Sequence, residues 1–419
     1  MSDKQAKRLL SIDALRGIAA LIVLFYHSRA MAWVGMSEFF HQHHSWSWDP
    51  SVWVGWLTTP FRVGFVGVQL LFVLSGYCIH RNQAKLLAQN NPAKLDIPHF
   101  AFRRFFRIYP TYVAALIVNG LVLYQLLPWL GSMGFPLSGP EGHHSWYIFF
   151  MNLLTMQNVI PGVPPYEGVF WSLSLEIHLY IAYPLVLWIS RRYGPSRMML
   201  VSFLAGVGHM IASFFFAGTP TADLLLGISG FTFYWFTWCA GAYVAEMQFG
   251  RAKPIRLPGF VWMLMGAAGI ALFMISNGSD GQPTRFAHYQ FNAVGEFLMA
   301  LMMAALLAWS IRPNTQHIWT SPFPRLLAFI GTFSFTLYAI HVPILHTVTA
   351  LWGGKPNSVL LAYLAAIIAI VVAYLFFNLV ERWTLSPPKN FFVTKAKPPA
   401  LNPVLEGPAV TAPDSTPAV

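Results

Sequence analysis

The sequence predicts an all-α fold, a polytopic membrane protein built as a bundle of about ten transmembrane helices. Hydrophobic residues occupy 56% of its 419 positions and charged residues only 10%, whereas soluble domains carry about 25% charged residues. The apolar residues form runs long enough to cross about 30 Å of hydrocarbon, and basic residues lie between these runs. The net charge of +11 is therefore a membrane topology signal, and no nucleic-acid partner is expected.

Ten apolar runs are long enough to be transmembrane helices. In chain order they are Ile12 to Val34, Phe61 to Ile79, Phe106 to Trp129, Val169 to Ile189, Met198 to Phe216, Leu224 to Met247, Phe260 to Ser276, Tyr289 to Ile311, Leu326 to Trp352 and Val359 to Leu379. The first run is too long for the core of a cleavable signal peptide, so it is expected to remain in the mature protein. An even number of spans places both termini on one side.

The Lys and Arg residues orient these spans. They cluster before the first run and after every second run, whereas the loops 35–60 and 130–168 contain almost none. The positive-inside rule places the basic side in the cytoplasm. The chain is therefore divided into a cytoplasmic N-terminal segment (1–10), a membrane domain (11–385) and a disordered cytoplasmic tail (386–419).

The first run carries Arg16 and His27. Ionisable groups inside a bilayer are costly unless they are paired or hydrated, so each is a functional candidate. Their spacing places them within roughly 20° of one helix face, with a rise of about 16 Å. Arg16 is expected near the cytoplasmic surface and His27 past the midplane. A snorkelling arginine and a satisfied core histidine are the structural alternatives.

The fourth run carries a polar stripe. Ser172, Glu176 and Tyr180 recur at i, i+4 and i+8 and so share one helix face. Glu176 lies about two turns below the outer surface, the depth expected for His27. A carboxylate that accepts one imidazole N–H leaves the other ring nitrogen free to remove a hydroxyl proton, so the two are predicted to form an acid/base pair. A polar bridge that only fastens two helices is the alternative.

Three arginines lie where the third run enters from the cytoplasm. Arg103 and Arg107 are spaced i, i+4, and Arg104 and Arg107 are spaced i, i+3, so their guanidinium groups can converge on one anion. The alternative is an anchor at the lipid headgroups.

Other histidines have weaker assignments. His341, in the outer half of the ninth run, is either a second polar contributor to the site or structural. His41, His43 and His44 have no partnering Cys or carboxylate at ligand spacing, so no metal is expected.

Several ordered segments carry a family resemblance. They are Ile12 to Ala20 with His27, Gly67 to Tyr77, Arg103 to Pro110, Trp171 to Pro184, Phe333 to His341, and Glu381. Together they resemble the acyltransferase-3 family of integral membrane acyltransferases over residues of about 10 to 385. The resemblance implies catalytic roles for His27 and Glu176. It also implies a donor site that includes Arg16, Ser75, Gly76, Arg103, Arg104 and Arg107.

The resemblance also implies a function: an acyl-CoA-dependent O-acyltransferase in the plasma (inner) membrane. The donor would be cytoplasmic acyl-CoA, most typically acetyl-CoA, and the acceptor a hydroxyl of a surface polysaccharide, a lipid-linked sugar or a related envelope molecule. His27 would act as general base or as a transient acyl carrier. No SGNH-type domain is expected, and proteins of envelope-glycan synthesis are possible partners. A transporter or flippase for an envelope intermediate is the competing hypothesis, and a silent assembly scaffold is a third.

Overall fold

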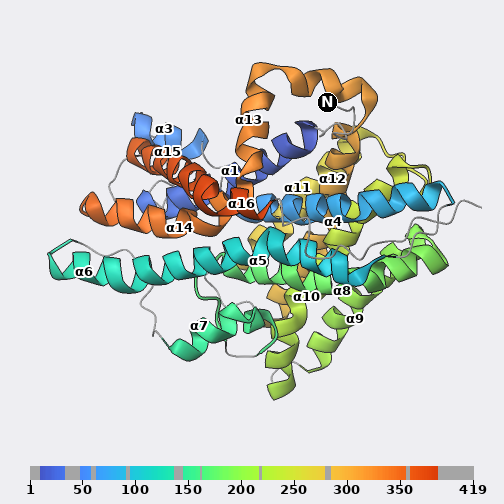
Figure 1. Ribbon diagram of the computed structural model, residues 1–419, viewed down its shortest axis with the longest axis horizontal. Helices are drawn as coiled ribbons and strands as arrows, with labels where there is room; N and C mark the ends of the chain where they lie inside the picture. Colours follow the sequence, from blue (N-terminus) through green and yellow to red (C-terminus); the bar gives the residue numbers. More distant parts are fainter. Residues whose placement is uncertain are drawn as a thin grey trace, which may run out of the picture.

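The computed structural model is all-α, as the sequence predicts (Figure 1). It describes residues 10–33, 48–57, 63–90, 95–135, 145–160, 163–216, 219–278, 285–354 and 359–385, and no β-strand occurs within these ranges. The loop histidines His41, His43 and His44, nearly all of the N-terminal segment and the tail lie outside the described residues.

Ten long helices correspond to the ten predicted runs. They are α1 (Leu10–Ala32), α4 (Gly64–Ala88), α5 (Ile97–Leu121), α8 (Phe170–Tyr193), α9 (Pro195–Phe215), α10 (Pro220–Gln248), α11 (Gly259–Gly278), α12 (Arg285–Ser310), α14 (Ser334–Leu351) and α15 (Val359–Phe376). In the described part of the chain, eight helical stretches are long and apolar enough to cross a membrane, and Gly259–Phe273 in α11 is a shorter apolar helix. The chain is a polytopic membrane protein.

Shorter helices complete the fold. They are α3 (Pro50–Leu57), the π-helix η2 (Val122–Leu126), α6 (Leu127–Ser132), α7 (Trp146–Leu153), the 3₁₀ helices η3 (Met156–Asn158) and η4 (Pro313–Thr320), α13 (Pro322–Thr332), the π-helix η5 (Phe377–Glu381) and α16 (Arg382–Thr384). The π-helix η2 continues α5 into α6, so the third predicted run is one stretch over Ile97–Ser132.

The ninth predicted run, Leu326 to Trp352, is two helices rather than one. α13 ends at Thr332 and α14 begins at Ser334, with Phe333 between them at φ −119° and ψ 20°. The two helices run in different directions (Figure 1). Both halves are apolar, so hydropathy alone does not reveal the break.

Glycines allow several pairs of helices to approach closely. A Cβ added to Gly76 in α4 would lie 1.9 Å from the carbonyl oxygen of Trp238 in α10, and one added to Gly241 would lie 1.9 Å from that of Val73. Gly331 in α13 bears the same relation to Asp13 in α1, at 1.8 Å. These contacts bring backbone against backbone, which only residues without a Cβ permit.

α1 lies at the centre of one half of the molecule. It packs against α4, α13, α14 and α15, whereas α8 packs mainly against α9, α10 and α5. This arrangement decides which polar side chains meet in the interior.

Candidate active site

A cavity of about 110 Å³ lies between α1, α4, α5, α8 and α14. Its polar lining comprises Arg16, Ser75, Cys78, Arg104, Arg107, Ser172, Glu176, Tyr180, Ser334 and Tyr338. Five helices that are distant in the sequence thus bring together the polar stripe of α8, the serine of α4 and the basic residues of α1 and α5.

Glu176 is held in this cavity by two hydroxyl groups. Ser75 Oγ donates to Glu176 Oε1 at 2.8 Å, and Tyr180 Oη donates to the same oxygen at 2.6 Å. The indole N–H of Trp238 donates in turn to Ser75 Oγ at 3.3 Å. Two donors to one carboxylate oxygen fix the position of the side chain.

The three arginines of the cavity differ in their partners. Arg107 forms an ion pair with the buried Glu381, with 3.1 Å between Nη1 and Oε1, and Arg16 lies 3.9 Å from Asp13. Arg104 lies over the rings of Phe100 and Tyr180, at 5.8 and 5.9 Å from their centroids. Within the described residues no carboxylate forms a salt bridge with Arg104. Arg104 is therefore the cavity cation most available to an incoming anion.

His27 pairs with His341 rather than with Glu176. His27 Nδ1 and His341 Nε2 are 2.9 Å apart. His341 Nδ1 lies 2.8 Å from the carbonyl oxygen of Tyr338 and 3.1 Å from that of Leu337. A carbonyl only accepts, so Nδ1 of His341 carries the proton and its Nε2, in the neutral ring, is an acceptor. His27 must then donate through Nδ1, which leaves its own Nε2 with a free lone pair.

The histidine pair lies outside the cavity. Neither His27 nor His341 lines it, but Tyr338 does, and the Tyr338 backbone holds His341. The Tyr338 hydroxyl is hydrogen-bonded to Ser172 Oγ at 2.6 Å. Tyr338 therefore connects the two groups, since its side chain lines the cavity and its backbone carbonyl binds His341.

Two residues expected at the donor site lie elsewhere. Arg103 is exposed and does not line the cavity, because the helix turns Arg104 and Arg107, three residues apart, toward the interior. Gly76 contributes close packing of α4 on α10 rather than a polar contact. Its neighbour Ser75 alone faces the cavity.

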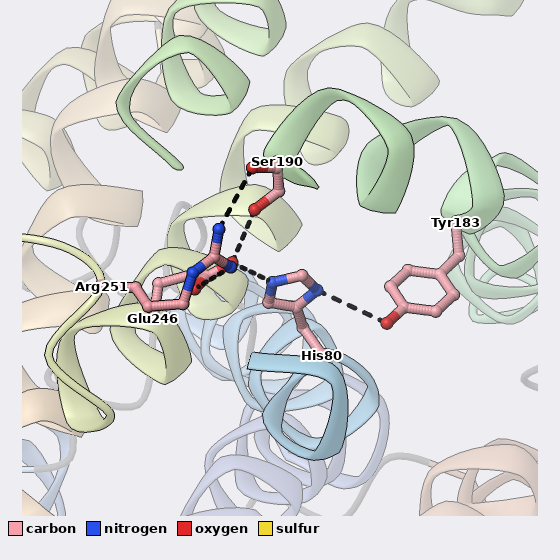
Figure 2. A network of polar contacts seen from close by, with 5 residues as sticks. All are labelled: His80, Tyr183, Ser190, Glu246 and Arg251. Atoms are coloured by element: carbon pink, nitrogen blue, oxygen red, sulfur yellow. Dashed lines mark hydrogen bonds and ion pairs between the residues drawn. The ribbon is translucent and has the colours of Figure 1, made fainter. Parts of the chain in front are cut away.

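The sequence analysis missed a buried ionic network, drawn in Figure 2. His80 Nε2 lies 2.7 Å from Glu246 Oε1, and Arg251 Nη1 lies 2.8 Å from both carboxylate oxygens of Glu246. Ser190 Oγ donates to Glu246 Oε1 at 2.6 Å, and Tyr183 Oη lies 3.4 Å from His80 Nδ1. The network joins the ends of α4, α8 and α10. In the sequence, the ionisable residues near the ends of these hydrophobic runs were only a weak signal that the groups would meet.

Glu381 was part of the quoted resemblance, but its partners were not predicted. Besides Arg107 it accepts a hydrogen bond from Thr336 Oγ1 at 2.6 Å, and it is fully buried. In the described residues, no cluster of three His, Cys, Asp or Glu side chains is arranged to hold a metal ion.

Comparisons with known proteins agree with this architecture. The family described as "Acyltransferase domain" matches residues 9–378. The chain is 23% identical to Peptidoglycan O-acetyltransferase OatA of Listeria monocytogenes, over 94% of this chain and 60% of that protein. It is 24% identical to Acyltransferase MdmB of Streptomyces mycarofaciens, over 83% and 82% of the two chains. It is 23% identical to Nodulation protein 10 of Rhizobium leguminosarum bv. viciae, over 74% and 81%.

The chain thus spans only about three fifths of the Listeria protein's length. No solved structure matches it. The family match covers nearly the whole chain, and the structure is a helical bundle with a basic polar cavity. The chain belongs to the acyltransferase-3 family of integral membrane acyltransferases.

Proposed function

We propose that the protein is a membrane-embedded O-acyltransferase that moves an acyl group, most simply acetyl, from cytoplasmic acyl-CoA to a hydroxyl of a cell-envelope glycan. The arrangement that supports the proposal is a cavity lined by arginines, together with His27, which lies on α1 eleven residues beyond the cavity residue Arg16. On the predicted topology the arginines would face the cytoplasm, and the histidine with a free ring nitrogen would lie on the outward side of the cavity. Family membership supports acyl transfer, and the names of relatives support O-acetylation.

The histidine pair supplies the base. Nε2 of His27 takes the proton from the acceptor hydroxyl as its oxygen attacks the thioester carbonyl. A C–O bond forms, the C–S bond breaks, and His27 returns the proton to the departing thiolate. His341 acts as a positioning residue, because its Nε2 accepts from His27 and so fixes the reactive tautomer. A route through a transient acyl-histidine uses the same nitrogen.

The arginines supply the donor site. Arg104 offers an uncompensated guanidinium to the phosphates of coenzyme A, while Arg16 and Arg107 extend the positive lining. Glu176, held by Ser75 and Tyr180, is a fixed acceptor for polar groups of the pantetheine arm. The cavity's 110 Å³ is well below the roughly 300–1,000 Å³ usual for ligand pockets, so donor entry requires the lining side chains to move apart.

The class of acceptor is inferred from the names of relatives and from side chains suited to binding sugars. Peptidoglycan is named for the Listeria relative, and we extend to this chain only the class, a hydroxyl of an envelope glycan or lipid-linked sugar. Exposed aromatic rings on the side predicted to face outward, such as Trp53 and Trp146, are suited to stacking on sugars. The protein would then reside in the plasma (inner) membrane, where it would meet enzymes of envelope-glycan synthesis.

The test is mass spectrometry of envelope glycans and lipids from cells with and without the gene. Complementation with the wild type should add the mass of one acyl group to one glycan class, and complementation with His27→Ala should not. Purified His27→Ala should still bind acetyl-CoA, whereas Arg104→Ala should bind it more weakly. Turnover by His27→Ala would refute the mechanism. A change in glycan location with no acyl mass difference would instead identify a transporter.

A further inference from the structure

A second, larger cavity opens between α9, α10, α11 and α12. Its volume is about 700 Å³, within the range of ligand-binding pockets. The side chains around it are largely apolar and include Met199, Met247, Met263, Trp262 and Trp309. It has no lining residue in common with the cavity that holds Glu176.

The architecture explains why the cavity exists. α11 packs chiefly on α12, and the two backbones touch at Gly269 and Gly295, where an added Cβ would lie 2.9 and 2.8 Å from the opposite carbonyl oxygen. Toward the end of the bundle predicted to face the cytoplasm α11 stays close to α12, since a Cβ added to Gly266 would lie 2.9 Å from Met302, while both helices leave space on the side of α9 and α10. The space left between α10, α11 and α12 is the cavity.

The depth of the cavity matches one membrane leaflet. Along α12 its lining extends from Leu301 to Trp309, with Arg312 just past the helix end. From Leu301 to Trp309 the helix rises about 12 Å, and Arg312 lies three residues further on, so the lining approaches half of a hydrocarbon core of about 30 Å. An acyl chain whose headgroup lay at Arg312 would therefore reach the inner end of the cavity near the bilayer midplane.

The mouth of the cavity is cationic. Arg312 lines it and is exposed, and Lys253 and Arg256 are exposed beside the lining residues Pro254, Ile255 and Leu257. In the described residues none of these three cations forms a salt bridge. The nearest carboxylate along the chain, Glu246, is already bound by Arg251 and His80. Positive charge above an apolar slot fits a molecule with an anionic head and a hydrocarbon tail.

We propose that this cavity binds a phospholipid with an anionic headgroup, its phosphate at Arg312 and an acyl chain between α10, α11 and α12. Trp309 and Trp262 lie at the level of the headgroup, the position that amphipathic rings favour. The site is separate from the proposed acyl-transfer site, so it stands whether or not acyl transfer is confirmed.

Native mass spectrometry of the purified full chain tests the proposal. Phosphatidylglycerol and phosphatidylcholine with identical acyl chains would be compared as probes. Phosphatidylglycerol should bind more tightly, and Arg312→Ala should weaken it by about fivefold, since one cation near an anionic headgroup contributes that much. Ala305→Trp, which fills the slot, should abolish binding of both lipids at this site.

The matched control is Arg325→Ala, which removes an exposed cation from the same predicted side of the membrane but away from the cavity. It should leave lipid binding unchanged, and thermal unfolding should show that all three variants fold. Equal binding of the two lipids would overturn the proposal. So would retention of phosphatidylglycerol by the folded Ala305→Trp variant, since that outcome means the lipid lies elsewhere.

Discussion

In the histidine pair, the hydrogen bonds of His341 determine which ring nitrogen of His27 carries a proton. His341 has its Nδ1 proton committed to backbone carbonyls, so only its Nε2 remains to receive His27. His341 is fully enclosed, at 1% exposure, and water cannot replace that contact. The tautomer of His27 is thus determined by the backbone of α14.

Replacing His341 should therefore disable His27 without disturbing the donor site. In His341→Ala we expect kcat to fall about 100-fold, the low end of what general-base catalysis contributes, while KM for acyl-CoA stays near the wild-type value. Steady-state kinetics in detergent measure both constants. The pH profile of kcat/KM should also move, which a purely structural defect would not produce.

His178→Ala is the matched control for that experiment. His178 lies on α8 near Thr155, at 3.4 Å, and does not line the cavity. It should retain kcat. Wild-type kcat in a folded His341→Ala protein would reject the positioning role.

Glu167 makes stability depend on pH. It lies in the segment before α8, is 9% exposed, and accepts a hydrogen bond from the backbone N–H of Val169 at 3.0 Å. Burial raises the pKa of its carboxyl to about 7, so the folded protein holds a proton that the unfolded chain releases near pH 4.5. The stabilising contribution is complete below pH 4.5 and is lost as pH rises through 7.

Thermal or denaturant unfolding between pH 5 and 8 checks this expectation. The free energy of unfolding of the wild type should fall by up to about 3 kcal/mol across this range. The pKa difference between the folded and unfolded states is about 2.5, and each pKa unit corresponds to about 1.4 kcal/mol. Glu167→Gln should lack that component of the pH dependence. An equal slope in the variant would show that another group titrates.

At the scale of helices, backbone contact replaces side-chain interdigitation at several helix crossings. Gly76 and Gly241 let α4 and α10 touch, and this contact places Trp238 beside Ser75, to which it donates a hydrogen bond. The helix crossing thus also shapes the cavity. Small residues at such crossings are typical of membrane helices.

Gly76→Ala should be clearly destabilising, because its Cβ would meet a carbonyl oxygen at 1.9 Å and the two helices would have to separate. Overpacking of this kind costs about 1–3 kcal/mol, and donor affinity should fall with it as Ser75 shifts. Gly208→Ala in α9 is the control, since an added Cβ there meets nothing within 4 Å. Thermal midpoints of the two variants should differ by several degrees. Equal midpoints would mean that α4 and α10 are free to move apart.

At the scale of the whole molecule, the sequence predicts the helices well and their neighbours poorly. Hydropathy locates the long helices, because a helix must be apolar to cross a bilayer, and eight stretches in the described part of the chain meet that requirement. The break at Phe333 escapes this argument, because both sides of it are apolar; after the break is made, α13 packs against α1. Contacts between segments that are distant along the chain leave no periodic pattern in the amino-acid sequence.

The candidate site divides in the same way. Helical spacing correctly places Ser172, Glu176 and Tyr180 on one face. Equal depth alone suggested that Glu176 would meet His27, but α14 rather than α8 packs along α1, so His341 meets it instead. Which face of a helix meets which neighbouring helix depends on tertiary packing. The spacing of residues within one helix does not reveal it.

The ion pair between Arg107 and Glu381 has a consequence for biogenesis. The arginine belongs to the third span and its partner to the end of the last. During synthesis Arg107 enters the bilayer long before the ribosome has delivered its counter-charge, and until then it must stay hydrated at the interface. A chain synthesised only as far as its third span therefore lacks the carboxylate that neutralises Arg107, and this part of the cavity lining is completed only when the last span is in place.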